Sequence, residues 1–146
     1  MEPIKPVDGF VAHTGTPKGR GVFSARSFRT DEVIERCPVV MFDGSYSDLP
    51  QPLKNLVFSW SRLANLERPC QALALGYGSL YNHDNPSNLR YEADVQNRLL
   101  AFIADRDIAK GEELTVNYNA TGGGASWDNN NWWFERNNIQ PITTNS

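Results

Sequence analysis

The stretch LYNHDNPSN, residues 80–88, decides how the rest of the chain is interpreted. An apolar run, ALAL at residues 72–75, leads into it, so residues 72–81 are expected to be buried and to deliver Asn82 and His83. A buried amide and imidazole need partners for several donors and acceptors. The pair therefore indicates either a turn whose Asn and His bond nearby backbone, followed by an Asn-Pro loop, or a functional site.

Length and composition favour one small β-rich domain. The 146 residues include nine prolines and eleven glycines, which break the chain into short pieces and favour strands and loops over long helices. We expect a single domain over residues 1–146, with a core at about residues 8–118 and a C-terminal segment at residues 119–146. The net charge of −3 and the lack of a Lys/Arg cluster argue against nucleic-acid binding, whereas an acidic chain suits a basic peptide.

The cysteines and the N-terminal sequence predict a protein of the cytoplasm, or of the nucleus in a eukaryote. The first residues, MEPIKP, contain no apolar signal region, and no stretch approaches membrane-spanning length. Cys37 and Cys70 have no metal-type neighbours, so no metal site is expected. Free thiols fit a reducing compartment, and one disulfide is the alternative.

Strand patterns cover most of the chain. Strands are expected at residues 10–13, 22–25, 31–35, 38–42, 89–93, 98–104 and 113–118. The strands at 89–93 and 98–104 are expected to pair across residues 94–97. Leu53, Leu56, Val57 and Trp60 stand at i, i+3, i+4 and i+7, which predicts one amphipathic helix that packs on the core. His13 is expected to be a packed or surface histidine. No internal repeat is evident in the sequence.

Two further motifs flank the opening stretch. KGRGVF at residues 18–23 lacks the third glycine of a dinucleotide fingerprint, so it is either a hairpin turn or a bare backbone ledge for a ligand. GEELTVNY, residues 111–118, follows later. The ordered trio of Gly-x-Gly-Val-Phe, Asn-His with a second Asn six residues after the first, and Gly-Glu-Glu-Leu-x-x-x-Tyr resembles the SET-domain protein-lysine methyltransferases, from about Gly15 to Tyr118.

The resemblance implies a mainly β fold with short helices, in which several small sheets surround a pseudo-knot made by the second and third motifs. It implies transfer of a methyl group from S-adenosyl-L-methionine to a lysine of a basic protein or peptide, histone or histone-like. Positioning the reactants is worth up to about 7–11 kcal/mol in such reactions. An apolar channel helps because desolvation lowers the pKa of a lysine, which is near 10.4 when free.

The resemblance also implies roles for particular residues. Tyr118 matches the family tyrosine that lies beside the reacting methyl group. The remaining positions are a cofactor set, Lys18, Gly19, Arg20, Gly21, Asn82, His83 and again Tyr118, and a substrate-channel set, Tyr77, Tyr91, Val116 and Ala120. Tyr91 is equally well explained as an aromatic residue in a strand. Val116 and Ala120 are small, which predicts room for more than one methyl group on the lysine.

Two departures from the family pattern concern cofactor affinity. The family often reads Asn-His-Ser-x-x-Pro-Asn, whereas here Pro86 stands one place early and Asn88 keeps its position. The frequent acidic residue before the last tyrosine is Asn117. A catalytically silent SET fold that binds peptides is the alternative function, and a structural β-domain with coincidental motifs is a third interpretation.

The C-terminal segment changes character after Tyr118. Glycines at residues 122–124 and asparagines at residues 129–131 precede three aromatic residues, Trp132, Trp133 and Phe134. One interpretation is an anchor that packs these rings on the core. The other, which the resemblance implies, is a lid in which Trp133 or Phe134 covers the adenine of the cofactor.

Overall fold

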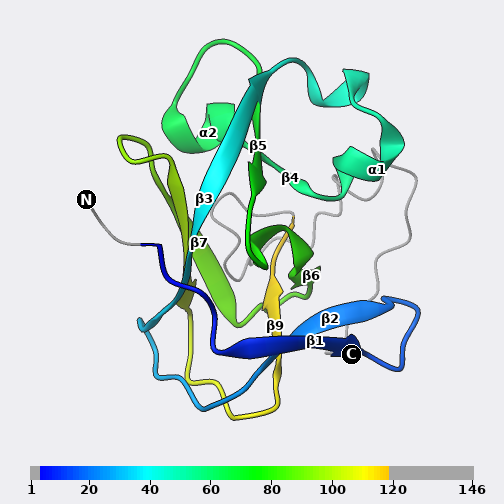
Figure 1. Cartoon of the computed structure of the whole chain (residues 1–146), viewed down its shortest axis with the longest axis vertical. Helices are drawn as coiled ribbons and strands as arrows, with labels where there is room; N and C mark the ends of the chain where they lie inside the picture. Colours follow the sequence, from blue (N-terminus) through cyan, green and yellow to red (C-terminus); the bar gives the residue numbers. More distant parts are fainter. Residues whose placement is uncertain (1–3, 119–146) are drawn as a thin grey trace.

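Two small sheets make up the part of the chain that the structure, a computed structural model, describes, residues 4–118 (Figure 1). The strand orders are β1-β2-β9-β6 and β4-β5-β3-β8-β7. The elements run as follows: β1 Gly9–His13, β2 Arg20–Ser24, β3 Val33–Asp43, η1 Tyr46–Asp48, α1 Gln51–Lys54, β4 Val57–Ser59, α2 Trp60–Ala64, β5 Cys70–Ala74, η2 Gly78–Leu80, β6 Asn82–His83, β7 Leu89–Asp94, β8 Leu99–Ala104 and β9 Glu113–Val116. The prediction of a mainly β fold with short helices is confirmed.

The long strand β3 joins the two halves of the five-stranded sheet. Two separate strands were expected around Pro38, but β3 runs through this proline without a break. Its first half pairs with β8 as far as Pro38, and its second half pairs with β5 from Val39 onward. The proline therefore lies where the strand changes partners, a position at which a missing N–H is tolerated more easily than inside a continuous ladder.

The predicted amphipathic helix at residues 53–60 is wrong. Its first residues, Leu53 and Lys54, end the short helix α1, and residues 57–59 form β4, which pairs with Leu73, Ala72 and Gln71 of β5. A Val-Phe pair has high strand propensity, and an available partner strand outweighs a helical spacing of apolar residues. The last residue of the pattern, Trp60, starts α2 and is fully buried.

The expectation for residues 72–81 holds only in part. Ala72, Ala74 and Tyr81 are buried, but Leu75 and Leu80 are exposed. Gly76, with a φ of +73°, turns the chain after β5, so the segment leaves the five-stranded sheet and continues through η2 to β6 in the four-stranded sheet.

Two matching turns connect the sheets, although no repeat was evident in the sequence. Phe28 and Ile108 exchange both backbone hydrogen bonds, at 2.9 Å each. In one turn the Glu32 carboxylate accepts from the Arg29 N–H, and in the other the Glu112 carboxylate accepts from the Ala109 N–H. Each glutamate follows a residue with positive φ, Asp31 in the first turn and Gly111 in the second. The two turns share this geometry and also an Arg–Glu ion pair at the same spacing, Arg26–Glu32 in the first and Arg106–Glu112 in the second.

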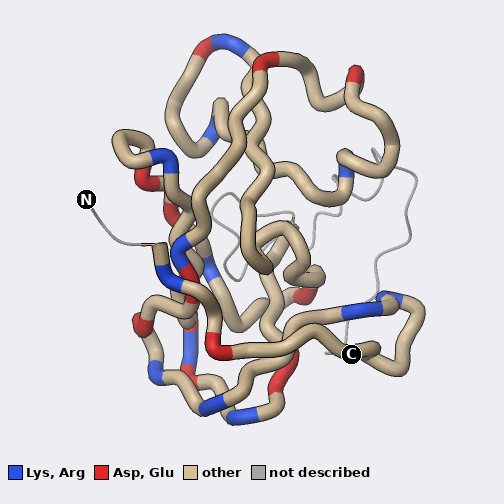
Figure 2. Tube along the Cα trace, viewed as in Figure 1, with Lys and Arg blue, Asp and Glu red and all other residues tan. Residues whose placement is uncertain are grey.

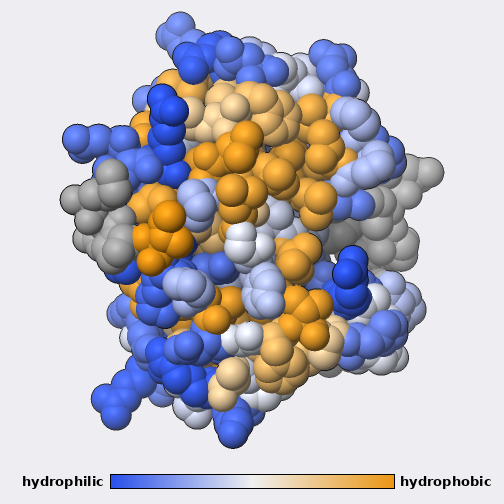
Figure 3. Space-filling model, in the orientation of Figure 1, coloured by the Kyte–Doolittle hydropathy of each residue, from blue (hydrophilic) through white to orange (hydrophobic). Residues whose placement is uncertain are grey.

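Charged and apolar surfaces separate on the face that the figures show. Lys, Arg, Asp and Glu lie mainly at the turns and loops, and the trace of β5 and η2 carries none (Figure 2). Apolar residues gather where β3 and β5 face the viewer (Figure 3). Within residues 4–118, no helix has the length and apolar character needed to cross a membrane.

Three smaller expectations can be compared directly with the structure. Cys37 and Cys70 are buried free thiols, as predicted. His13 is a surface histidine, and its Nδ1 accepts a hydrogen bond from the Gly15 N–H at 2.9 Å. The segment that contains Gly19 and Gly21 closes the β1–β2 hairpin, and Gly19 has a φ of +78°.

Candidate functional site

The candidate site lies where the second and third motifs meet. β6 runs parallel to β9, with Asn82 opposite Thr115 and His83 opposite Val116. The Asp84 N–H donates to the Val116 carbonyl at 3.1 Å, which continues the pairing past the strand. Two motifs that are distant in the sequence therefore share one short ladder. His83 contacts Tyr118 just beyond its end, and the Asn82 side chain contacts Glu113 at the start of β9.

Two hydrogen bonds hold Tyr118 in place immediately after β9. Its backbone N–H donates to Nδ1 of His83 at 3.1 Å. Its hydroxyl donates to the backbone carbonyl of Tyr81 at 2.7 Å. The His83 and Tyr118 rings are 5.4 Å apart between centroids. The hydroxyl proton is therefore directed at the Tyr81 carbonyl, which fixes the orientation of the phenol.

Burial controls the protonation of both rings. Desolvation lowers the pKa of His83 to about 4, and the nearby Lys18 ammonium acts in the same direction while Asp84 opposes it. Burial also raises the pKa of the Tyr118 phenol, with smaller contributions from Glu113 and Tyr91. At neutral pH the imidazole is therefore uncharged and the phenol keeps its proton.

The glycine motif borders the same site. The Asn82 side-chain amide donates to the Arg20 carbonyl at 2.9 Å and to the Glu113 carboxylate at 2.7 Å. A Cβ built on Gly21 would collide with that carboxylate and lie 3.0 Å from the Asn82 amide nitrogen. Because Gly21 has no Cβ, these two side chains have space to contact the backbone of the first motif.

The Lys18 ammonium has an unusual environment. It is shielded from solvent, and residues 4–118 offer it no hydrogen-bond partner. A shielded ammonium without a partner is unfavourable, so this position suits an anionic group of a ligand. The Coulomb effect of Lys18 on His83 places this charge near the histidine.

The predicted channel residues occupy different environments. Tyr91 and Tyr77 are partly buried and pack against the core, and the Tyr91 ring lies 5.0 Å from that of Phe58. Tyr91 also influences the pKa of Tyr118, so the two phenols are near each other. Val116 is buried in the core cluster. The channel roles of these residues stay predictions, and Ala120, Trp132, Trp133 and Phe134 lie outside the described residues.

The sequence analysis assigned no role to three polar residues that border the site. Glu113 accepts from Asn82, and Tyr81 supplies the carbonyl that binds Tyr118. Glu35 accepts the Tyr81 hydroxyl at 2.6 Å. Tyr81 and Glu113 lie within the second and third motifs, so their positions in the sequence could have suggested a role at the site. Glu35 lies in a distant strand and has no local signal.

Asn88 ties the two motifs together below the site. Its side-chain oxygen accepts from the Thr115 N–H, and its side-chain nitrogen donates to the Glu113 carbonyl, both at 2.8 Å. Asn88 is buried, so these bonds are not exchanged for water. No group of three His, Cys, Asp or Glu side chains with metal-binding geometry occurs in residues 4–118.

The depressed pKa of His83 predicts a pH-dependent stability. Between about pH 4 and pH 6.5 the unfolded chain binds a proton at this residue that the folded chain does not. Stability is therefore complete above pH 6.5 and falls as the pH drops toward 4. Between pH 7 and pH 5 we expect a loss of about 2 kcal/mol in urea denaturation. The variant His83→Gln should lose most of this slope, and an unchanged slope would contradict the assignment.

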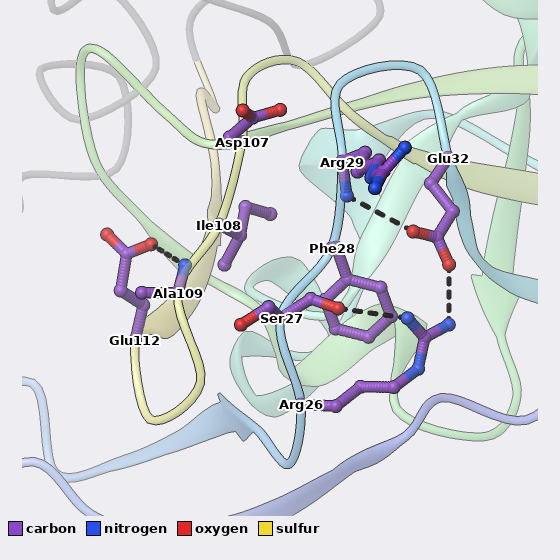
Figure 4. Close-up of a pocket in the computed structure, with 9 residues that line it drawn as sticks. All are labelled: Arg26, Ser27, Phe28, Arg29, Glu32, Asp107, Ile108, Ala109 and Glu112. Atoms are coloured by element: carbon purple, nitrogen blue, oxygen red, sulfur yellow. Dashed lines mark hydrogen bonds and ion pairs between the residues drawn. The ribbon is translucent and has the colours of Figure 1, made fainter.

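A pocket lies at the matching turns, and the residues that line it include none of Asn82, His83 and Tyr118 (Figure 4). Most of its charged groups are already engaged within the protein. Arg26 pairs with Asp8 and Glu32, while Asp107 accepts from the backbone and hydroxyl of Thr30. Glu112 pairs with Arg106 and caps the Ala109 N–H. We therefore interpret this pocket as a junction of two turns and not as the functional site.

Comparisons with known proteins agree with this geometry. Residues 19–119 match the SET domain family. A Schizosaccharomyces pombe protein named histone-lysine N-methyltransferase, H3 lysine-37 specific, is 33% identical over 108 residues, which is 69% of this chain and 67% of that protein. A crystal structure of a Plasmodium falciparum protein described as a histone methyltransferase aligns with a TM-score of 0.61 and 26% identity, covering 83% of this chain and 96% of that one.

Proposed function

Because the family match spans residues 19–119, the chain belongs to the SET-domain family, and from this premise we propose that it is a protein-lysine N-methyltransferase. The observation that carries the proposal is the double anchoring of Tyr118, through its N–H to His83 and through its hydroxyl to the Tyr81 carbonyl. A hydroxyl with a fixed position can orient an incoming amine. Within the proposal, Tyr118 is the catalytic residue.

The methyl donor in the proposal is S-adenosyl-L-methionine, and the residues present fit it. The shielded Lys18 ammonium has no partner within residues 4–118 and suits a carboxylate. Gly19, Arg20 and Gly21 present backbone at the edge of the site, next to the amide of Asn82. When bound, this cofactor supplies a sulfonium methyl group, whose C–S bond breaks as a new N–C bond forms to the lysine.

The described residues prepare the acceptor amine for attack. The amine must lose its proton first, and the partly buried ring of Tyr91, which lies near Tyr118, lowers the polarity there. The phenolic oxygen of Tyr118 can then accept a hydrogen bond from the neutral amine and orient its remaining lone pair. Because burial raises the pKa of this phenol, it stays protonated and does not form an anion next to the amine.

The proposed substrate is a lysine in a histone or another basic protein. Both relatives described above carry histone methyltransferase names. The chain has a net charge of −3, which favours association with a basic segment. A nuclear or cytoplasmic location agrees with such a substrate. The aromatic lid at Trp133 or Phe134 and room for more than one methyl group stay predictions within this proposal.

The first test is binding of the methyl donor followed by transfer. Saturating S-adenosylmethionine, with no metal added, should raise the melting temperature, because a ligand of the native state stabilises it. Incubation with core histones should then produce methyl-lysine detectable by mass spectrometry. Binding without transfer to any basic protein would favour the silent peptide-binding alternative, and absence of binding would count against both cofactor and reaction.

Two glycine variants sharpen the binding test. Gly21→Ala should weaken cofactor binding about tenfold, because the new methyl group displaces the Asn82 amide and the Glu113 carboxylate. Gly15→Ala is the matched control, since Gly15 has a φ of +76° but nothing within 4 Å of an added Cβ. The control should lose a little stability and keep its affinity. If both variants weakened cofactor binding equally, the backbone of residues 18–21 would not be part of the proposed cofactor site.

A further inference from the structure

Glu35 is buried in the core and has no part in the chemistry proposed above. Its side chain is 3% exposed, and no Lys or Arg within residues 4–118 forms an ion pair with it. An unpaired buried carboxylate is costly unless hydrogen bonds compensate it. Such a residue is unexpected in the middle of a strand, and the structure shows what it binds.

A β-bulge directs Glu35 into the core. The register between β3 and β8 shifts between Val33, which pairs with Ile103, and Glu35, which pairs with Phe102. The extra residue, Ile34, is also buried, so two successive side chains of β3 are inside. In a regular strand they would point to opposite faces. Bulges of this kind re-aim side chains, and this one presents the carboxylate to the segment that precedes Asn82.

The Glu35 carboxylate binds both ends of the segment from Tyr77 to Tyr81. One oxygen accepts the Tyr81 hydroxyl at 2.6 Å, and the other accepts the Tyr77 backbone N–H at 3.0 Å. These two hydrogen bonds hold the segment against β3. A Cβ on Gly76 would lie 2.5 Å from the carboxylate, so a residue without a side chain allows this close approach.

The same segment ends at the partner of the Tyr118 hydroxyl. Tyr81 is 1% exposed, and its ring packs 4.8 Å from that of Phe102 between centroids. With the ring held by Phe102 and the hydroxyl by Glu35, the Tyr81 main chain has little freedom to move. Its carbonyl accepts the Tyr118 hydroxyl at 2.7 Å. Glu35, Tyr81 and Tyr118 therefore form a continuous connection from β3 to the proposed reaction centre.

We propose that Glu35 is a positioning residue which, by clamping Tyr77 and Tyr81, fixes the carbonyl that orients the Tyr118 hydroxyl. This rests on the proposed methyltransferase function and names a determinant of its rate. A misplacement of a reacting group by a fraction of an ångström lowers a rate without preventing binding. The clamp should therefore affect kcat and leave cofactor affinity nearly unchanged.

The decisive variant is Tyr81→Phe, which removes one hydroxyl and keeps the ring packing. We expect kcat to fall about tenfold while the Kd for S-adenosylmethionine changes less than about twofold. The same substitution in a Tyr118→Phe background should change the residual rate less than about twofold, because the hydroxyl that the clamp positions is already absent. A purely structural role for the clamp would lower both backgrounds by the same factor.

Two further variants complete the experiment. Glu35→Gln keeps an oxygen that can accept the Tyr81 hydroxyl, so it should retain more of kcat than Glu35→Leu at a temperature where all the proteins are folded. Ile34→Val is the control for loss of core stability next to the bulge, and it should keep wild-type kcat. If the wild type methylates and Tyr81→Phe is fully active, or loses the same factor in both backgrounds, the positioning role is wrong. A wild type without activity would instead overturn the proposed function.

Discussion

Replacement of Tyr118 by phenylalanine should reduce methyl transfer at least about a hundredfold, the loss typical when one preorganised polar group is removed from a reaction centre. The hydroxyl donates to the Tyr81 carbonyl and, in the proposed reaction, accepts from the lysine amine. Neither interaction is required to hold the methyl donor. Single-turnover rates should therefore fall while the Kd for S-adenosylmethionine stays within about threefold, as expected for a contact that matters mainly in the transition state.

Tyr46→Phe provides a matched control for this substitution. The Tyr46 hydroxyl also donates to a backbone carbonyl, that of Lys54 at 2.9 Å, but it is part of η1 and not of the Tyr118 site. Both variants lose one tyrosine hydroxyl, and only Tyr118→Phe should lose activity. A Tyr118→Phe rate near that of the wild type would exclude this residue from the catalytic role, whatever the control does.

The meeting of the motifs was expected from the resemblance to the SET-domain family, which implies a pseudo-knot made by the second and third motifs. Asn82 and His83 follow an apolar run, and a buried amide and imidazole require specific partners. The structure supplies these partners from the third motif, with the Tyr118 N–H on His83 and the Glu113 carboxylate on Asn82. Polar residues that must be satisfied internally therefore carried more information about the site than the strands did.

The helix predicted at residues 53–60 shows where a local pattern is insufficient. Its apolar spacing fits a helix, but the same residues also suit a short strand, and β5 offers a partner to Val57 and Phe58. The choice depends on the partners of Val57 and Phe58, which are Leu73 and Ala72 in β5, and local spacing within residues 53–60 cannot decide it. The outcome was a three-residue strand between two short helices.

Glu35 illustrates a limit of a different kind. Its neighbours in the sequence, Ile34 and Arg36, form no regular alternation from which its direction could be predicted. The bulge at Ile34 sets that direction, and its partners Tyr77 and Tyr81 are more than forty residues away. A one-residue shift in register exchanges the two faces of a strand, and no feature of residues 31–35 predicts this bulge. The contribution of such residues to a site becomes visible only in three dimensions.

Asn88 should contribute more to stability than any other side-chain amide within the described residues that border the site. Replacement by alanine leaves the Thr115 N–H and the Glu113 carbonyl without their partner in a buried environment. A buried backbone group that loses its partner costs about 1–3 kcal/mol, so the variant should lose roughly 2–4 kcal/mol in urea denaturation. Because the lost bonds hold the segment after β6 against β9, cofactor binding should weaken in the same variant.

The control is Asn97→Ala, in the loop between β7 and β8. The Asn97 amide donates to the Asp94 carboxylate at 2.9 Å, within a loop that water can reach. The same chemical change should cost less than about 1 kcal/mol there, because water replaces the lost partner. Equal losses for the two variants would show that Asn88 does not bind the motifs together more strongly than an ordinary loop contact. A large loss for Asn88→Ala with unchanged cofactor affinity would separate its role in the fold from the proposed cofactor site, since Asn82 and His83 would then keep their positions without it.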